Sequence, residues 1–73
     1  MRYFYEYKYK RGNGMVGGHN LENIIIRDNK IILKGVDIMP TYYDDEHHYW
    51  TQTLDMNEIE YLKIWPMLEK END

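Results

Sequence analysis

The sequence predicts a small α+β domain, in which a four-stranded, mostly antiparallel sheet carries one C-terminal helix. Three observations lead to this fold class: a hairpin signal in residues 24–33, a strictly alternating run in residues 2–11, and a helix-start signal at Asp55 that good helix formers follow. The chain has 73 residues, which is enough for one domain over residues 1–73 and close to the lower limit for a self-sufficient core.

Residues 24–33 form the hairpin signal, because two aliphatic runs flank the dipeptide Asp28-Asn29. Both turn residues tolerate the positive φ values that a two-residue hairpin turn requires. Such a turn sets a register in which Ile26 faces Ile31, Ile25 faces Ile32 and Ile24 faces Leu33, continuing to Leu21 opposite Val36. Since side chains alternate between faces, one face is expected to be the core face, and it consists of Ile24, Ile26, Ile31 and Leu33.

The second face of this hairpin combines aliphatic and basic side chains. It carries Leu21, Ile25, Ile32 and Val36 among Arg27, Lys30 and Lys34. We expect this face to be half-covered, and a homodimer contact would form there if the chain associates with itself.

The remaining sheet strands are predicted from alternation and residue type. In residues 2–11, four tyrosines line one face and charged residues dominate the other, which is typical of a strand. Residues 12–18 are glycine-rich and predict a loop. They match G-x-G-x-x-G, but they lead into a strand instead of a helix, so phosphate binding is not expected. A polar connection over residues 37–47 and a strand over residues 48–54 complete the sheet.

The C-terminal helix is predicted from a capping box, Asp55-Met56-Asn57-Glu58. We expect a helix over residues 56–64, a break at Trp65-Pro66 and a last turn through residues 67–70, packed on the core face of the hairpin. An alternative remains open, because residues 59–65 also tolerate a strand. Residues 55–58 would then be a tight turn, and the fold would be a small all-β barrel.

The composition excludes several function classes. The chain contains neither cysteine nor serine, so a disulfide framework, a thiolate metal site, a cysteine nucleophile and a Ser-His-Asp triad are all excluded. The cluster of acids and histidines in residues 44–48 has poor spacing for metal ligands, and we expect no metal, no cofactor and no enzymatic activity. No signal segment or membrane span is recognisable, so we expect a cytoplasmic protein.

The charge is divided along the chain. Residues 1–36 hold seven basic and three acidic residues, a net charge of +4, whereas residues 37–73 hold two basic and ten acidic residues, a net charge of −8. Such asymmetry indicates a charged partner. In addition, 34 of the 73 residues are Phe, Tyr, Met, Ile, Asn or Lys, which have AT-rich codons. This bias indicates an AT-rich genome, such as that of a low-GC bacterium or one of its phages.

Two functional hypotheses follow from these features. The first is a non-enzymatic interaction protein, analogous to small phage inhibitors, whose acidic half binds a basic, nucleic-acid-binding surface of a host protein. Its expected binding residues are acids with aromatic anchors: Tyr43, Asp44, Asp45, Glu46, Trp50, Glu58, Glu60 and Trp65. The second is single-stranded nucleic-acid binding by the N-terminal strand. In that case bases would stack on tyrosines and lysines would contact phosphates, the residues being Tyr5, Tyr7, Tyr9, Lys8 and Lys10.

Overall fold

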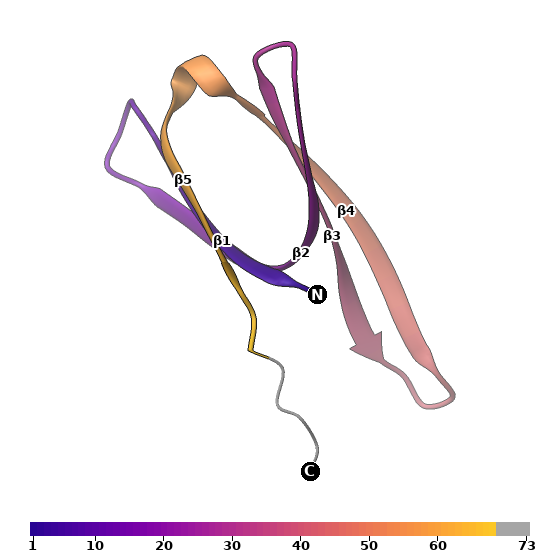
Figure 1. Ribbon diagram of the computed structural model, residues 1–73. Coiled ribbons are helices and arrows are strands. Elements are labelled where there is room, and N and C mark those ends of the chain that lie inside the picture. The colour runs from indigo at the N-terminus through magenta and orange to yellow at the C-terminus, as the bar shows by residue number, and fades with distance from the viewer. Residues whose placement is uncertain (69–73) are drawn as a thin grey trace.

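The protein is an antiparallel sheet of five strands in the computed structural model, which describes residues 1–68 (Figure 1). The strands are β1 (Tyr3–Tyr9), β2 (Met15–Arg27), β3 (Lys30–Pro40), β4 (Asp45–Asp55) and β5 (Ile59–Pro66). A 3₁₀ turn, η1 (Met56–Glu58), joins β4 to β5. The spatial order is β4-β3-β2-β1-β5, so β4 and β5 are the two edge strands of an open sheet.

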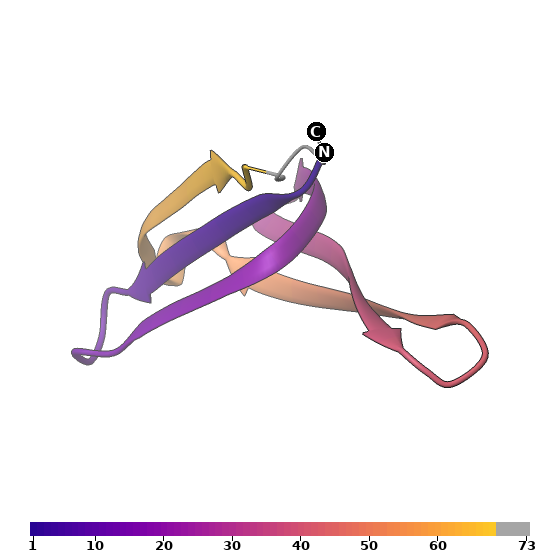
Figure 2. The same ribbon diagram turned by 90° about the horizontal axis from the view of Figure 1, so that it is seen from below.

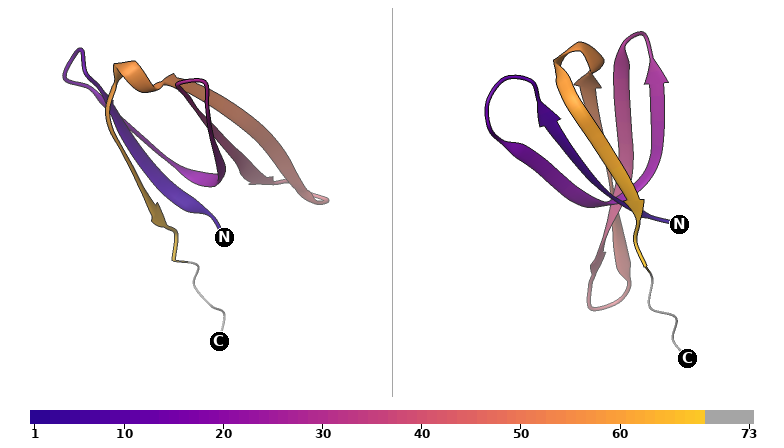
Figure 3. Two further views of the ribbon diagram at one scale, coloured as in Figure 1. Left: turned by 45° about the horizontal axis from the view of Figure 1, so that its top comes forward. Right: turned by 60° about the vertical axis from the view of Figure 1, so that its left-hand side comes forward.

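The sheet bends sharply in the middle of β2. The first half of β2 pairs with β1 and the second half pairs with β3, while Leu21 pairs with both Tyr3 and Gly35. The register shifts beside Leu21 in both pairings. Such bulges bend a strand and increase its local twist. Consequently the strands fan out from this region and do not lie in one plane (Figures 2 and 3).

The bend brings side chains from all five strands together on the inner face of the sheet. The core cluster there consists of Tyr7, Leu21, Ile31, Leu33, Leu54 and Ile59. Two contacts cross the bend between β1 and β4, which are not neighbours in the sheet. The ring centroids of Tyr5 and Trp50 lie 5.8 Å apart, and the Gln52 amide donates a hydrogen bond to the Tyr7 hydroxyl. Side chains on the two sides of the bend therefore pack against each other and cover the inner face, which no helix covers within residues 1–68.

The predicted C-terminal helix is wrong, and the fold class is all-β instead of α+β. Residues 59–66 form β5, which pairs with β1 from Ile59 opposite Tyr9 to Pro66 opposite Tyr3. The Asp55 side chain does cap the following turn, accepting a 2.9 Å hydrogen bond from the Asn57 N–H, but only the three residues of η1 follow it. The predicted last turn through residues 67–70 lies partly outside the described residues.

The reason for this error is a long-range partner. β1 has two edges, and β2 satisfies the backbone groups of only one of them; β5 satisfies the other. The alternative of a strand over residues 59–65 after a tight turn at residues 55–58 is therefore the better description, although the sheet stays open and is not a closed barrel. The prediction of four strands also missed the fifth strand.

The hairpin prediction is confirmed. Asp28 and Asn29 adopt φ values of 52° and 59°, and Ile26, Ile25 and Ile24 face Ile31, Ile32 and Leu33 as expected. The strands are longer than predicted, since β3 continues to Pro40 and β4 begins at Asp45. The predicted polar connection is thus two strand ends joined by a four-residue turn.

The predicted core face of the hairpin is right in only part. Ile31 and Leu33 are buried, whereas Ile26 next to the turn is 64% exposed. Leu21, expected on the second face, is fully buried on the inner face, because the bulge pairs it with Gly35 instead of Val36. A one-residue register shift moves a side chain to the other face of a sheet.

Candidate functional site

The β3–β4 hairpin projects beyond the rest of the sheet (Figure 1). The pairing of β2 with β3 ends at Gly35, whereas β3 and β4 remain paired as far as Pro40 opposite Asp45. Residues 36–49 therefore form a two-stranded projection, which we call the acidic arm. It carries four acids and no lysine or arginine, the acids being Asp37, Asp44, Asp45 and Glu46.

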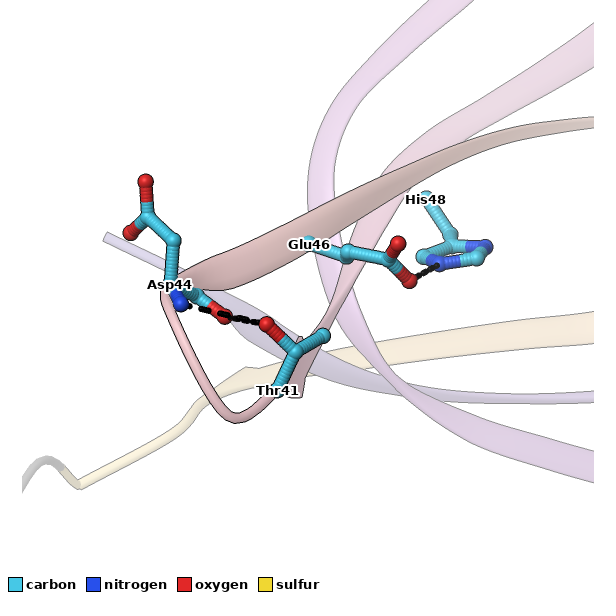
Figure 4. A network of polar contacts seen from close by, with 4 residues as sticks. All are labelled: Thr41, Asp44, Glu46 and His48. Atoms are coloured by element: carbon cyan, nitrogen blue, oxygen red, sulfur yellow. Dashed lines mark hydrogen bonds and ion pairs between the residues drawn. The ribbon is translucent and has the colours of Figure 1, made fainter.

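Local hydrogen bonds hold the tip of the acidic arm (Figure 4). The Thr41 N–H donates to the Asp44 carbonyl at 2.9 Å, and the Asp44 N–H donates to the Thr41 hydroxyl oxygen at 3.1 Å. The Asp44 carboxylate accepts from the Asp45 N–H at 2.8 Å. Short polar side chains that bond to nearby backbone groups favour turns. At the base, the Asn20 amide donates to the Asp37 carboxylate at 3.3 Å. The arm is thus a defined element of the fold.

Large aromatic side chains are exposed along the acidic arm. Tyr42 and Tyr43 at the tip are each 92% exposed, and their ring centroids lie 4.8 Å apart in an edge-on arrangement. Tyr49 and Met39 on the two strands are also exposed. Exposed tyrosines provide large, rigid contact area with a polar tip, which is typical of the anchors of protein interfaces.

The charge of the arm is not neutralised by lysine or arginine within residues 1–68. Its one close contact there between an acid and a basic side chain joins the Glu46 carboxylate to the His48 ring at 3.2 Å (Figure 4), and this contact is an ion pair only when the ring is protonated. Two lysine pairs occur away from the arm: Lys30 on β3 lies 3.3 Å from Asp55 at the opposite end of β4, and Lys8 on β1 lies 3.1 Å from Glu60 on β5. These pairs neutralise two acids of the C-terminal half with lysines of the N-terminal half. The acids of the arm have no such lysine partner within residues 1–68, so the arm keeps its negative charge.

The structure brings together only four of the eight predicted binding residues. Tyr43, Asp44, Asp45 and Glu46 meet at the tip of the acidic arm. Glu58 and Glu60 follow the far end of β4, in η1 and at the start of β5, and Glu60 is paired with Lys8.

The two predicted tryptophan anchors lie elsewhere. Trp50 is half-buried at the base of the arm, where its ring packs beside Tyr5 and over Gly35. Trp65 on β5 lies beside Phe4, with ring centroids 5.8 Å apart. Trp50 is thus mainly a packing residue, and Trp65 belongs to a separate surface.

Sequence reasoning missed four exposed or polar members of the arm: Asp37, Met39, Tyr42 and Tyr49. The sequence predicts a connection over residues 37–47, so strand alternation does not place Asp37, Met39 or Tyr42, whereas Tyr49 lies in the predicted strand over residues 48–54, for which the local pattern does not show that it extends beyond the sheet. The polar–apolar sequence Asp37-Ile38 after Val36 was the available signal that β3 continues.

The tyrosines of β1 line the core and do not form an open stacking surface. Tyr7 is 1% exposed, and Tyr5 and Tyr9 are half-buried against the core cluster. Burial raises the pKa of the Tyr7 hydroxyl. Burial, and secondarily the charge of Asp37, raises the pKa of Tyr5. Bases could not stack on Tyr7 without unfolding β1, so the geometry disfavours the nucleic-acid hypothesis for this strand.

Other site types find little support in residues 1–68. A cleft of about 490 Å³ lies between the end of β1 and η1, and it is lined by Tyr9, Lys10, Arg11, Asn57 and Glu58. Among the described residues, no group of three or more acids and histidines is placed to hold a metal ion. No helix in this part of the chain is long and apolar enough to cross a membrane.

Comparison with known proteins gives no assignment: no protein-family model, curated protein or solved structure matches this chain.

Proposed function

We propose that this chain is a cytoplasmic, non-enzymatic interaction protein that binds a basic surface of a partner protein through the acidic arm. The observation that carries the proposal is the combination of four acids and three exposed tyrosines on a projecting hairpin without lysine or arginine. We expect the partner to be a nucleic-acid-binding protein, because the surface with which such a protein binds nucleic acid is rich in arginine and lysine.

Two physical effects favour this partner chemistry. Carboxylates at the tip attract arginine and lysine side chains and accelerate the encounter of the two proteins. The exposed rings of Tyr42 and Tyr43 add contact area, and a guanidinium group of the partner can make a cation–π interaction with a ring face. The proposal therefore expects binding that weakens as salt concentration rises.

The direct test is an NMR titration of the labelled protein with an arginine- and lysine-rich peptide. We expect shifts concentrated in residues 37–49 and reduced by salt. The triple variant Asp44→Asn/Asp45→Asn/Glu46→Gln should bind about tenfold more weakly or worse, since three charge contacts are lost.

The matched control neutralises three acids away from the arm, in the variant Glu22→Gln/Glu58→Gln/Glu60→Gln. It changes the net charge equally and should retain binding. Equal binding by the arm variant and the parent protein would refute the proposal. The same titration with a single-stranded oligonucleotide tests the alternative hypothesis, which expects shifts in β1 and no effect of the arm variant.

The partner itself can be sought by affinity capture from a lysate of a low-GC bacterium, with and without nuclease. A partner captured by the parent protein and by the control, but not by the arm variant, would fit the proposal. Recovery of nucleic acid alone would contradict it.

A further inference from the structure

The outer edge of β4 is long and unprotected. β4 has 11 residues and pairs with β3 in an unbroken register from Asp55 to Asp45, while no strand pairs with its other edge within residues 1–68. The strand contains no lysine, proline or bulge, which are features that usually prevent pairing at an edge. The other edge strand, β5, has 8 residues and carries both Lys63 and Pro66. β4 is therefore the edge that is open to a further strand.

Two hydrogen bonds at the ends of the β3–β4 pairing define which backbone groups of β4 face outward. The Thr41 N–H donates to the Asp44 carbonyl, and the Met56 N–H donates to the Asn29 carbonyl, each at 2.9 Å. Opposite residues in an antiparallel pair alternate between hydrogen-bonded and non-hydrogen-bonded positions. Both bonds fit one alternation along the unbroken register, in which the even-numbered residues of β4 bond to β3. The N–H and C=O groups of its odd-numbered residues therefore point away from β3.

The side chains at these odd-numbered positions favour pairing with another strand. Tyr49, Thr51 and Thr53 follow one another at alternate positions, and all three are exposed. Aromatic and β-branched side chains are the types that stabilise cross-strand pairs. The edge thus combines outward backbone donors and acceptors with side chains that suit a neighbouring strand.

The charge of β4 selects a basic occupant. The strand holds three acids, Asp45, Glu46 and Asp55, and neither lysine nor arginine. Lys30 lies 3.3 Å from Asp55, so the charge without a lysine partner is at the other end of the strand, next to Asp44. A second copy of β4 is not complementary, because full-length antiparallel pairing would set Asp45 of one strand opposite Asp55 of the other. A strand with lysine or arginine at one end is complementary.

We infer that the segment of the partner that binds the acidic arm is an extended, basic strand, which adds to the β4 edge as a further strand of the sheet. Its backbone bonds to the odd-numbered residues of β4, as in other cases where a peptide extends a sheet. Antiparallel pairing is the more stable orientation, so the lysine and arginine side chains at its C-terminal end lie beside Asp45 and Glu46. The inference rests on the proposed function and names the kind of segment that the acidic arm takes.

The test uses a synthetic peptide as long as β4, with alternating threonine and valine in its first half and lysine and arginine in its second half. When it is added to the labelled protein, the Tyr49, Thr51 and Thr53 amides should exchange hydrogen more slowly. The Trp50 and Gln52 amides, which face β3, should change little. The same peptide with methylated backbone nitrogens keeps its charge but loses its N–H donors, so it should bind at least about tenfold more weakly.

The variant Thr51→Pro tests the same edge from the side of the protein. Proline removes the outward N–H of this residue without removing a hydrogen bond to β3, and proline is tolerated at such edge positions. The variant should bind the unmethylated peptide at least about tenfold more weakly. The matched control Thr51→Val keeps the N–H and should bind like the parent protein. Circular dichroism checks that both variants fold, and the methylated peptide tests the inference on the parent protein itself.

Equal binding of the two peptides by the parent protein would overturn the inference. So would a parent protein that dimerises without peptide and already protects the odd-numbered β4 amides, because a second copy would then occupy the edge. The proposed function fails separately. Binding that the variant Asp44→Asn/Asp45→Asn/Glu46→Gln weakens, but that methylation of the peptide does not, would leave the proposed function standing and remove the inference. Binding that methylation weakens and the arm variant does not would refute the proposed function and leave only the pairing at the edge.

Discussion

Gly35 is the residue on which the packing of β1 against β4 depends most directly. A Cβ atom at this position would collide with the indole ring of Trp50 and with the Asn20 carbonyl oxygen. The backbone carbonyl cannot move freely, because Asn20 directly precedes the bend in β2. Glycine is needed here for space, since its absent side chain allows the Trp50 ring to lie on the β3 backbone.

We predict that Gly35→Ala lowers the free energy of unfolding by about 1–3 kcal/mol, the usual cost of overpacking. Chemical denaturation followed by tryptophan fluorescence measures this difference. Gly14→Ala is the control, because a Cβ atom there would meet nothing within 4 Å. An equal effect of both substitutions would show that the Trp50 contact does not constrain position 35.

The Tyr7 hydroxyl makes the stability sensitive to alkaline pH. Burial raises its pKa above the ordinary value of 10.0, so the folded state holds this proton more tightly than the unfolded state. Its stabilising contribution is complete below pH 10.0 and is lost as the pH rises through the higher folded pKa.

We therefore predict that the free energy of unfolding falls above pH 10.0, and falls less steeply in Tyr7→Phe. At neutral pH the same variant should be less stable, because Gln52 loses its hydrogen-bond acceptor. Urea denaturation at several pH values measures both effects. Tyr42→Phe, at a fully accessible ring, should follow the parent protein at every pH. A parallel pH dependence of Tyr7→Phe and the parent protein would contradict the assignment.

At the scale of single elements, the sequence was informative wherever a structure is specified by neighbouring residues. The Asp28-Asn29 turn sets the register of five residue pairs, from Arg27 opposite Lys30 to Asn23 opposite Lys34, and alternation in residues 2–11 predicts β1 correctly. The structure of residues 59–66 depends on pairing with β1, from Tyr9 opposite Ile59 to Tyr3 opposite Pro66, and local propensity could not reveal this long-range contact. The capping residue Asp55 was recognised correctly, but a cap specifies only where a helical turn begins.

The candidate site was predictable to the same extent. The tyrosine and the three acids at positions 43–46 could be recognised from the sequence, because they are consecutive and lie together in any fold. The separation of Glu58 and Glu60 from them could not be read, because it results from the length of β4 and from the ion pair with Lys8. Likewise, Leu21 lies in the core because of the bulge in β2, and no local sequence pattern predicts that bulge.

We predict that Ile31→Lys abolishes cooperative unfolding, because a buried and unpaired charge costs several kcal/mol and the core of a domain this small rarely contributes more than about 3–5 kcal/mol. Ile31 lies in the core cluster. The control is Ile26→Lys, on the facing position of the same hairpin, whose side chain is exposed and should tolerate the change. Thermal unfolding monitored by circular dichroism separates the two. A sharp transition in Ile31→Lys, near that of the parent protein, would contradict the core assignment.

At the scale of the whole molecule, side chains replace the missing layer that usually covers a sheet. Trp50 and Gln52 on β4 contact Tyr5 and Tyr7 on β1. These side-chain contacts across the bend cover the inner face of the sheet, although no backbone pairing joins β4 to β1. A single open sheet of this length would otherwise expose its apolar face to water. The two tryptophans therefore have different roles. Trp50 joins the β3–β4 side of the bend to the β1–β5 side through its contact with Tyr5, whereas Trp65 lies on the edge strand β5.

We predict that Trp50→Ala lowers the free energy of unfolding by about 2–3 kcal/mol, somewhat less than for a fully buried tryptophan. Trp65→Ala should cost at most about 1 kcal/mol, because its ring is substantially exposed. Urea denaturation followed by far-ultraviolet circular dichroism measures both variants without relying on tryptophan emission. The reverse order of effects would show that the halves are not held together through Trp50.

The pairing of β1 with β5 has a consequence for synthesis of the chain. Tyr3 pairs with Pro66, so β1, the first of these five strands to be synthesised, can gain its second neighbour only after β5 has been synthesised. The local β2–β3 hairpin can form early, since a two-residue turn connects its strands. Until β5 has been synthesised and can fold, one edge of the tyrosine-rich strand remains without the partner it has in the folded protein. During that interval this edge is open to pairing with other strands.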